Sequence, residues 1–114
     1  MSECTPDKWV IVRFKSEEYG EIDKILAGWY GGYLGSDEWK LSSGVNGTKL
    51  NLDENGHGLI TFVNESGSEY HCYTNCEGTS GYTQGIFNKY SEKCKEIGSD
   101  MTIILYKDWK PLYV

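Results

Sequence analysis

Two short apolar runs around a polar, glycine-containing tip constrain this chain more than any other feature. The first run is Leu59 to Val63, the second is Tyr70 to Tyr73, and Ser66-Gly67 lies between them. Short runs of β-branched and aromatic residues around such a tip are typical of a β-hairpin. A two-residue loop and a four-residue loop both pair Val63 with Tyr70, so we expect that register.

This register places apolar side chains on both faces of the hairpin. One face would hold Leu59, Thr61, Val63, Tyr70 and Cys72, and the other would hold Ile60, Phe62, His71 and Tyr73. A strand pair with one solvated face would instead alternate apolar and polar residues. Either protein covers both faces or one face is a binding surface, and packing alone is the commoner cause of such a pattern.

The composition is that of a folded, acidic chain. Of its 114 residues 39% are hydrophobic and 14% aromatic, which is too much for a disordered chain. The length suits one hydrophobic core, so we expect residues 1–114 to form one α+β domain. The net charge of -6 disfavours nucleic acid as a partner, because phosphate is neutralised by Lys and Arg. Solubility or a basic partner explains the acidic charge.

The sequence also bears on the compartment. The segment Met1–Asp7 has neither the basic nor the apolar region of a signal peptide, and no apolar run reaches membrane-spanning length. We therefore expect a cytoplasmic protein with no membrane partner, in which the cysteines stay reduced. The oligomeric state is left open.

Before the hairpin, the sequence predicts a strand, a helix and two more strands. Trp9 to Phe14 is the first strand, with Val10, Val12 and Phe14 facing the core. Ser16 then caps a helix that ends at glycines 28, 31 and 32, because apolar residues recur at helical spacing at Tyr19, Ile22, Leu26 and Trp29. Trp39–Ser43 and Thr48–Leu52 are strands joined by a turn at Asn46-Gly47, with Leu50 and Leu52 facing inward.

After the hairpin, the sequence predicts a second helix and a last strand. Thr83 caps a helix to Ile97, with Gly98 as its C-terminal glycine and a buried stripe at Ile86, Tyr90, Cys94 and Ile97. Met101–Tyr106 is a strand, followed by a tail at Trp109, Pro111 and Leu112 that lies over a sheet edge. The element order is β-α-β-β-β-β-α-β. We predict an antiparallel sheet of about five to six strands, with both helices on one face and the first and last strands side by side in the middle.

Two groups of residues could carry chemistry. The first is a metal set of His71, Cys72, Cys76 and Cys94, which lacks the second closely spaced Cys pair that is usual for zinc. The second is a thiol–imidazole pair of Cys72 or Cys76 with His57 or His71, which nothing in the sequence brings together. We predict no catalytic residues, no bound metal and no cofactor.

The aromatic residues are the candidate binding residues. Tyr and Trp are enriched at interfaces, because they bury a large area and keep a polar atom. Most should complete the core, but a subset at one end of the sheet is expected to bind a partner. The candidates lie near glycine-rich loops and are Trp29, Tyr30, Tyr33, Trp39, Tyr73 and Tyr82.

Two segments, Trp39–Gly44 and Ser66–Cys72, resemble segments of small accessory proteins of large tailed bacteriophages of the T-even type. This resemblance implies a compact acidic protein that binds and alters a host factor in an infected bacterium. We predict a non-catalytic cytoplasmic protein that occludes a host protein. The alternatives are a binder of a nucleotide or signalling molecule at the loop Trp29–Leu34, and a zinc-binding domain.

Overall fold

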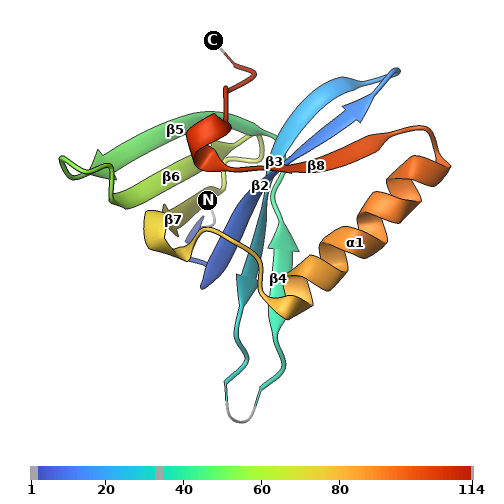
Figure 1. Ribbon diagram of the computed structural model, residues 1–114. Coiled ribbons are helices and arrows are strands. Elements are labelled where there is room, and N and C mark those ends of the chain that lie inside the picture. The colour runs from blue at the N-terminus through green and yellow to red at the C-terminus, as the bar shows by residue number, and fades with distance from the viewer. Residues whose placement is uncertain (1–2, 33–34, 114) are drawn as a thin grey trace.

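The computed structural model describes residues 3–32 and 35–113. Within them the chain forms two four-stranded sheets and one α-helix (Figure 1). The predicted α+β class with mainly antiparallel strands is confirmed. A second sheet and a single α-helix replace the one sheet and two helices that the sequence predicted.

Sheet A and sheet B are each built from four strands. The order in sheet A is β1 (Glu3–Cys4), β7 (Glu69–Tyr73), β6 (Gly58–Asn64) and β5 (Val45–Leu52), with β1 parallel to β7 and the other pairs antiparallel. The order in sheet B is β4 (Glu38–Leu41), β3 (Gly20–Trp29), β2 (Lys8–Ser16) and β8 (Asp100–Ile104), antiparallel throughout. The helical elements are η1 (Thr74–Cys76), α1 (Gly81–Glu96) and η2 (Tyr106–Asp108).

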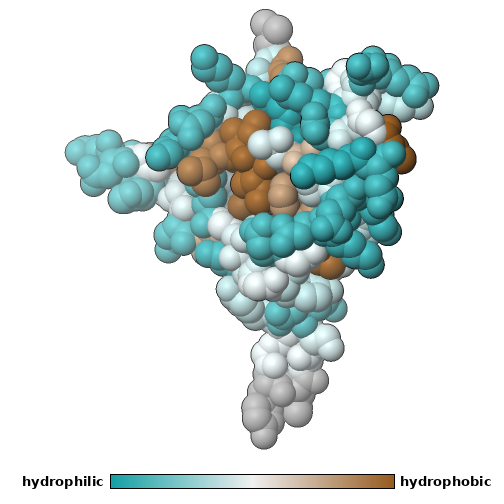
Figure 2. All heavy atoms as spheres, turned by 45° about the vertical axis from the view of Figure 1, so that its right-hand side comes forward, coloured by the Kyte–Doolittle hydropathy of each residue, from teal (hydrophilic) through white to brown (hydrophobic). Residues whose placement is uncertain are grey.

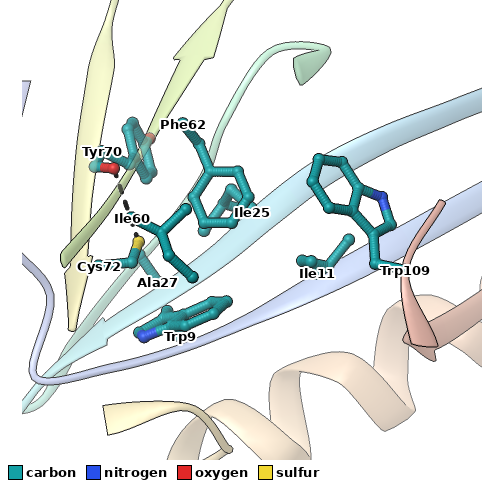
Figure 3. Packing of buried hydrophobic residues seen from close by; sticks show 9 residues of the cluster. All are labelled: Trp9, Ile11, Ile25, Ala27, Ile60, Phe62, Tyr70, Cys72 and Trp109. Carbon is teal, nitrogen blue, oxygen red and sulfur yellow. Dashed lines mark hydrogen bonds between the residues drawn. The ribbon is translucent and has the colours of Figure 1, made fainter. Parts of the chain in front are cut away.

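Sheet B is the middle layer, with sheet A on one side and α1 on the other (Figure 1). Its inner face packs on sheet A, so that residues of β2 and β3 meet residues of β6 and β7 (Figure 3). Its outer face packs on α1 through Val10, Val12, Leu26 and Met101. The central strands β2 and β3 are therefore buried on both faces, as the runs Trp9–Val12 and Ile25–Gly28 record.

The helix expected after Ser16 is wrong: residues 20–29 form β3 and pair along the whole of β2. Ser16 Oγ does accept a hydrogen bond from the Tyr19 backbone N–H, at 2.8 Å. A helix cap uses the same contact, but here it closes a hairpin turn that Gly20 completes with a φ of 76°. Because both faces of β3 are apolar, the alternation that marks a strand is hidden and a helical spacing emerges by coincidence.

The central hairpin is confirmed as β6 and β7, but its predicted register is wrong by one residue. Val63 pairs with Glu69 and Phe62 pairs with Tyr70. The loop has three residues, with Gly67 at a φ of 88° and a hydrogen bond from Asn64 N to Ser68 O. Because side chains alternate along a strand, a register shift of one residue places each side chain beside residues that the prediction had put on the opposite face of the hairpin. Ile60, Phe62, Tyr70 and Cys72 consequently share the buried face.

The predicted four-strand meander is also wrong. Strands β4 and β5 do not pair; β4 lies beside β3 in sheet B, whereas β5 lies beside β6 in sheet A. Asn46-Gly47 lies at a register shift inside β5 and not at a hairpin turn. Leu50 is 57% exposed, contrary to prediction, whereas Leu52 packs against the inner cluster.

The second predicted helix is confirmed as α1, with a different cap. Ser80 is the N-cap residue, and its side chain and that of Thr83 form a reciprocal capping box. Gly98 follows the helix with a φ of 79°. Of the predicted buried stripe, Ile86 and Cys94 pack on sheet B, whereas Ile97 is 78% exposed.

The last strand, β8, pairs with β2 as expected, but it lies at the edge of sheet B and not in its middle. The tail that follows turns inward. Trp109 packs edge-on against Phe62, with 5.6 Å between ring centroids (Figure 3). Its Nε1 donates to Asp23 Oδ2 at 2.8 Å. Arg13 donates to both carboxylate oxygens of Asp23 and to the Lys110 carbonyl. The tail thus closes the space between the sheets.

Candidate functional site

Two of the candidate aromatic residues support the structure. Trp29 is partly buried beside the inner cluster and donates from Nε1 to the Thr5 carbonyl at 3.0 Å. Trp39 packs on α1, with its ring centroid 5.6 Å from that of Tyr90. Trp39 pairs with Gly28, the residue before Trp29, so the two Trp side chains leave opposite faces of sheet B.

Three other candidates meet solvent, each on a different element. Tyr30 is 57% exposed after β3, Tyr73 is 47% exposed at the end of β7, and Tyr82 is 40% exposed in the first turn of α1. Tyr33 lies outside the described residues, as does Leu34 of the proposed ligand loop. No pair of packed rings joins two of the described candidates, and their role in binding stays a prediction.

The cysteines and histidines do not form the candidate metal set of His71, Cys72, Cys76 and Cys94, which we had not expected to bind metal. Among residues 3–32 and 35–113, the one group of three whose ligand atoms lie within 4.8 Å of one another is Glu3, Glu69 and His71. Cys72 is buried between the sheets, and this burial strongly raises the pKa of its thiol. A thiol held in its protonated form is a poor metal ligand and a poor nucleophile.

An apolar groove lies between the tip of the β2–β3 hairpin and the C-terminal end of α1. It encloses about 240 Å³. Its lining combines apolar side chains with lysines and serines and consists of Phe14, Lys15, Ser16, Tyr19, Gly20, Ile22, Lys24, Cys94, Ile97 and Ser99. We call this feature the hairpin–helix groove.

The side chains at the mouth of the groove are unusually exposed for their type. Tyr19 is 75% exposed, Ile97 is 78% exposed and Ile22 is 38% exposed. The face of the molecule that carries α1 also shows apolar side chains open to solvent between polar ones (Figure 2). Scattered apolar residues are normal on a surface, but a contiguous group around a hollow is a candidate for an interaction site.

Local structure fixes both walls of the groove. On one side, Gly20 and the Ser16–Tyr19 hydrogen bond set the hairpin tip, and Lys24 Nζ lies 5.6 Å from the centre of the Phe14 ring. On the other side, α1 ends at Glu96 and Gly98 reverses the chain toward β8. The groove is therefore built from two elements, the β2–β3 hairpin and the end of α1, with Tyr19 and Ile97 at its two rims.

Acidic residues surround the groove. Glu17 and Glu18 line an adjoining hollow together with Tyr19 and Ile97. Glu21 and Asp100 line a second one. Lys15 offsets part of this charge, because its Nζ lies 3.6 Å from Glu21 Oε1. The rim therefore has an excess of carboxylates, in keeping with the chain's net charge of -6.

Sequence reasoning missed this groove because it placed Tyr19, Ile22 and Ile97 in the buried stripes of two helices. The signal that could have found it is Gly20, which follows two glutamates and a tyrosine between apolar runs. Such a segment is also a turn pattern. A turn there would have put Tyr19 at an exposed tip.

No protein-family model, no curated protein and no solved structure matches this chain. Within the described part of the chain, no helix is long and apolar enough to cross a membrane.

Proposed function

We propose that this is a non-catalytic binding protein, and that the hairpin–helix groove takes an apolar side chain from a basic segment of a partner protein. The observation that carries the proposal is the exposure of Tyr19, Ile22 and Ile97 around an apolar hollow with an acidic rim. Aromatic and aliphatic side chains at the centre of an interface supply most of its binding energy.

Charge selects the kind of partner. The carboxylates of Glu17, Glu18 and Asp100 border the groove, so a segment rich in Lys or Arg gains attraction that an acidic segment does not. Exposed charges of this kind mainly raise the association rate, and salt screens them. Binding should therefore weaken as the salt concentration rises.

The groove lining favours binding over catalysis. It offers Lys15, Lys24 and the Cys94 thiol, but it includes neither a histidine nor a carboxylate that could act as a general base. The resemblance to phage accessory proteins adds a proposal for the partner, which is a host protein in the bacterial cytoplasm.

Affinity capture from a bacterial lysate, followed by binding measurements with the purified partner, tests the proposal. The variant Tyr19→Ser/Ile97→Ser should lose at least ten-fold in affinity, because it removes both exposed rims of the groove. The matched control Tyr30→Ser/Tyr73→Ser also removes two exposed side chains, but away from the groove, and should bind as the wild type does. The reverse result would locate the interface at the aromatic candidates and reject the groove.

A further inference from the structure

The outer face of sheet A, opposite the inner cluster, carries a ladder of polar side chains. Glu3 of β1 pairs in parallel with Glu69 of β7, and His71 lies two residues further along β7 on the same face. His71 in turn lies opposite Thr61 of β6. Two carboxylates and one imidazole therefore project from neighbouring positions of two adjacent strands.

The ligand atoms of Glu3, Glu69 and His71 all lie within 4.8 Å of one another. The His71 Nε2 and Glu3 Oε1 atoms are 3.0 Å apart. Two ligand atoms at about 2.1 Å from a tetrahedral ion lie about 3.4 Å apart. The cluster is close to the size that such an ion requires, and both glutamate side chains end in rotatable carboxylates.

A residue outside the cluster orients the imidazole. Thr61 is only 6% exposed, and its Oγ1 lies 2.8 Å from His71 Nδ1. A hydroxyl can accept a hydrogen bond from Nδ1–H, which leaves the Nε2 lone pair free for an ion. Histidines that bind metals almost always have such a partner on the other ring nitrogen.

The charges of the cluster also favour a cation. Like charges directly opposite each other on paired strands destabilise a sheet. Lys49 partly relieves this, with its Nζ 3.5 Å from each Glu69 carboxylate oxygen, but its side chain is 67% exposed. An ion bound by both carboxylates would neutralise them at shorter range than Lys49 does.

We propose that Glu3, Glu69 and His71 bind a divalent transition-metal ion of the zinc type, with Thr61 as the positioning residue. The mixed imidazole and carboxylate donors favour such an ion over Mg²⁺, which prefers oxygen ligands and retains its water. Three protein ligands leave at least one position for water. The ion would also attach the two-residue strand β1 to β7.

Calorimetric titration of the tag-free chain with Zn²⁺, and separately with Mg²⁺, tests this site. We expect one Zn²⁺ per chain and at least ten-fold weaker Mg²⁺ binding. Glu3→Gln should weaken Zn²⁺ binding at least ten-fold. The variant should fold as the wild type does, because the Glu3 side chain is 64% exposed. His71→Gln should do the same, whereas Glu54→Gln, in an exposed turn, should have no effect.

The variant Lys49→Met tests the site in the opposite direction, because it should strengthen Zn²⁺ binding. Removal of the competing ammonium should tighten Zn²⁺ binding several-fold, because Lys49 makes the one ion pair to Glu69 among residues 3–32 and 35–113. The absence of Zn²⁺ binding, or equal affinity for Zn²⁺ and Mg²⁺, would overturn the proposal. So would Zn²⁺ binding that survives both Glu3→Gln and His71→Gln, because the ion would then bind elsewhere.

Discussion

The two faces of sheet B are both apolar, but they are covered in different ways. On the inner face, Trp9 and Ile11 are at most 1% exposed beneath sheet A and the tail. On the outer face, Val12 is fully buried under α1, whereas Ile22, near the hairpin tip, is 38% exposed. A sheet and a tail close a surface that one helix covers only in part. The uncovered remainder is the hairpin–helix groove.

The largest expected contrast between the faces is in thiol reactivity. Cys72 lies in the inner layer, where burial raises the pKa of its thiol, whereas Cys94 lines the groove. We expect a thiol reagent to modify Cys72 about a thousand-fold more slowly than Cys94, because Cys72 reacts only after the layers open. Mass spectrometry of peptides after timed labelling measures both rates. Similar rates would show that the inner layer opens readily.

Trp109→Ala should have the largest effect on stability. It removes a ring that packs on Phe62 and donates to Asp23, so we expect a loss of about 4 kcal/mol in the free energy of unfolding. Urea denaturation measures it. The control Leu112→Ala, at a 43% exposed side chain of the same tail, should cost less than about 0.5 kcal/mol. A loss below about 1 kcal/mol for Trp109→Ala would mean that the tail does not close the inner face.

Asp23→Asn should have the next largest effect on the free energy of unfolding. Asp23 is 3% exposed and pairs with Arg13 at 2.8 Å, so the substitution leaves the guanidinium with only the more exposed carboxylate of Glu21, 3.9 Å away. We expect a loss of about 3 kcal/mol, the lower end for a buried pair, because Arg13 keeps some contact with water. Thermal and urea unfolding both measure it. Glu21→Gln, at an exposed position near the same arginine, should cost less than about 0.5 kcal/mol.

Gly28→Ala tests how closely α1 docks on the outer face. An added Cβ would lie 2.5 Å from Cγ2 of Thr83, which is 2% exposed at the start of the helix. We expect a loss of about 1–3 kcal/mol from overpacking. The matched control is Gly85→Ala in α1, which meets nothing within 4 Å and should gain about 0.5–1 kcal/mol. Equal effects in urea denaturation would mean that the helix can shift on the sheet.

Substitutions in the groove should affect stability least. Tyr19→Ser and Ile97→Ser remove side chains that are 75% and 78% exposed, so each should change the free energy of unfolding by less than about 0.5 kcal/mol. Thermal unfolding of both variants checks this. A loss above about 2 kcal/mol would show that the groove is part of the core and was not left open for a partner.

The sequence predicted the structure best where the local residues are compatible with only one backbone conformation. The two apolar runs around Ser66-Gly67 form the hairpin, and Gly98 ends α1 as a C-terminal glycine. The sequence was misleading where one local contact is compatible with two different structures. The contact between Ser16 Oγ and Tyr19 N–H fits a helix start and a turn equally well, and only the pairing of β3 with β2 decides between them.

The candidate sites were also difficult to predict, because contacts between distant parts of the sequence form them. Whether a ring such as Trp39 is buried depends on its contact with Tyr90 of α1, which is distant in sequence. The groove joins Tyr19 of the hairpin with Ile97 after the helix, and no local pattern relates these positions. Likewise, Glu3 meets His71 only because β1 pairs with β7.

The pairing of β2 with β8 has a consequence for the order of folding. The hairpins β2–β3 and β6–β7 bring together neighbouring parts of the chain, whereas Ile11 must find Ile104 across nearly the whole sequence. Pairing between distant segments forms slowly. Until β8 arrives, an intermediate would present the unsatisfied backbone edge of a hydrophobic strand, which is a template for aggregation. We therefore expect the pairing of β8 with β2 to be a late step, and the edge of β2 to be the part of the sheet most exposed to aggregation before it.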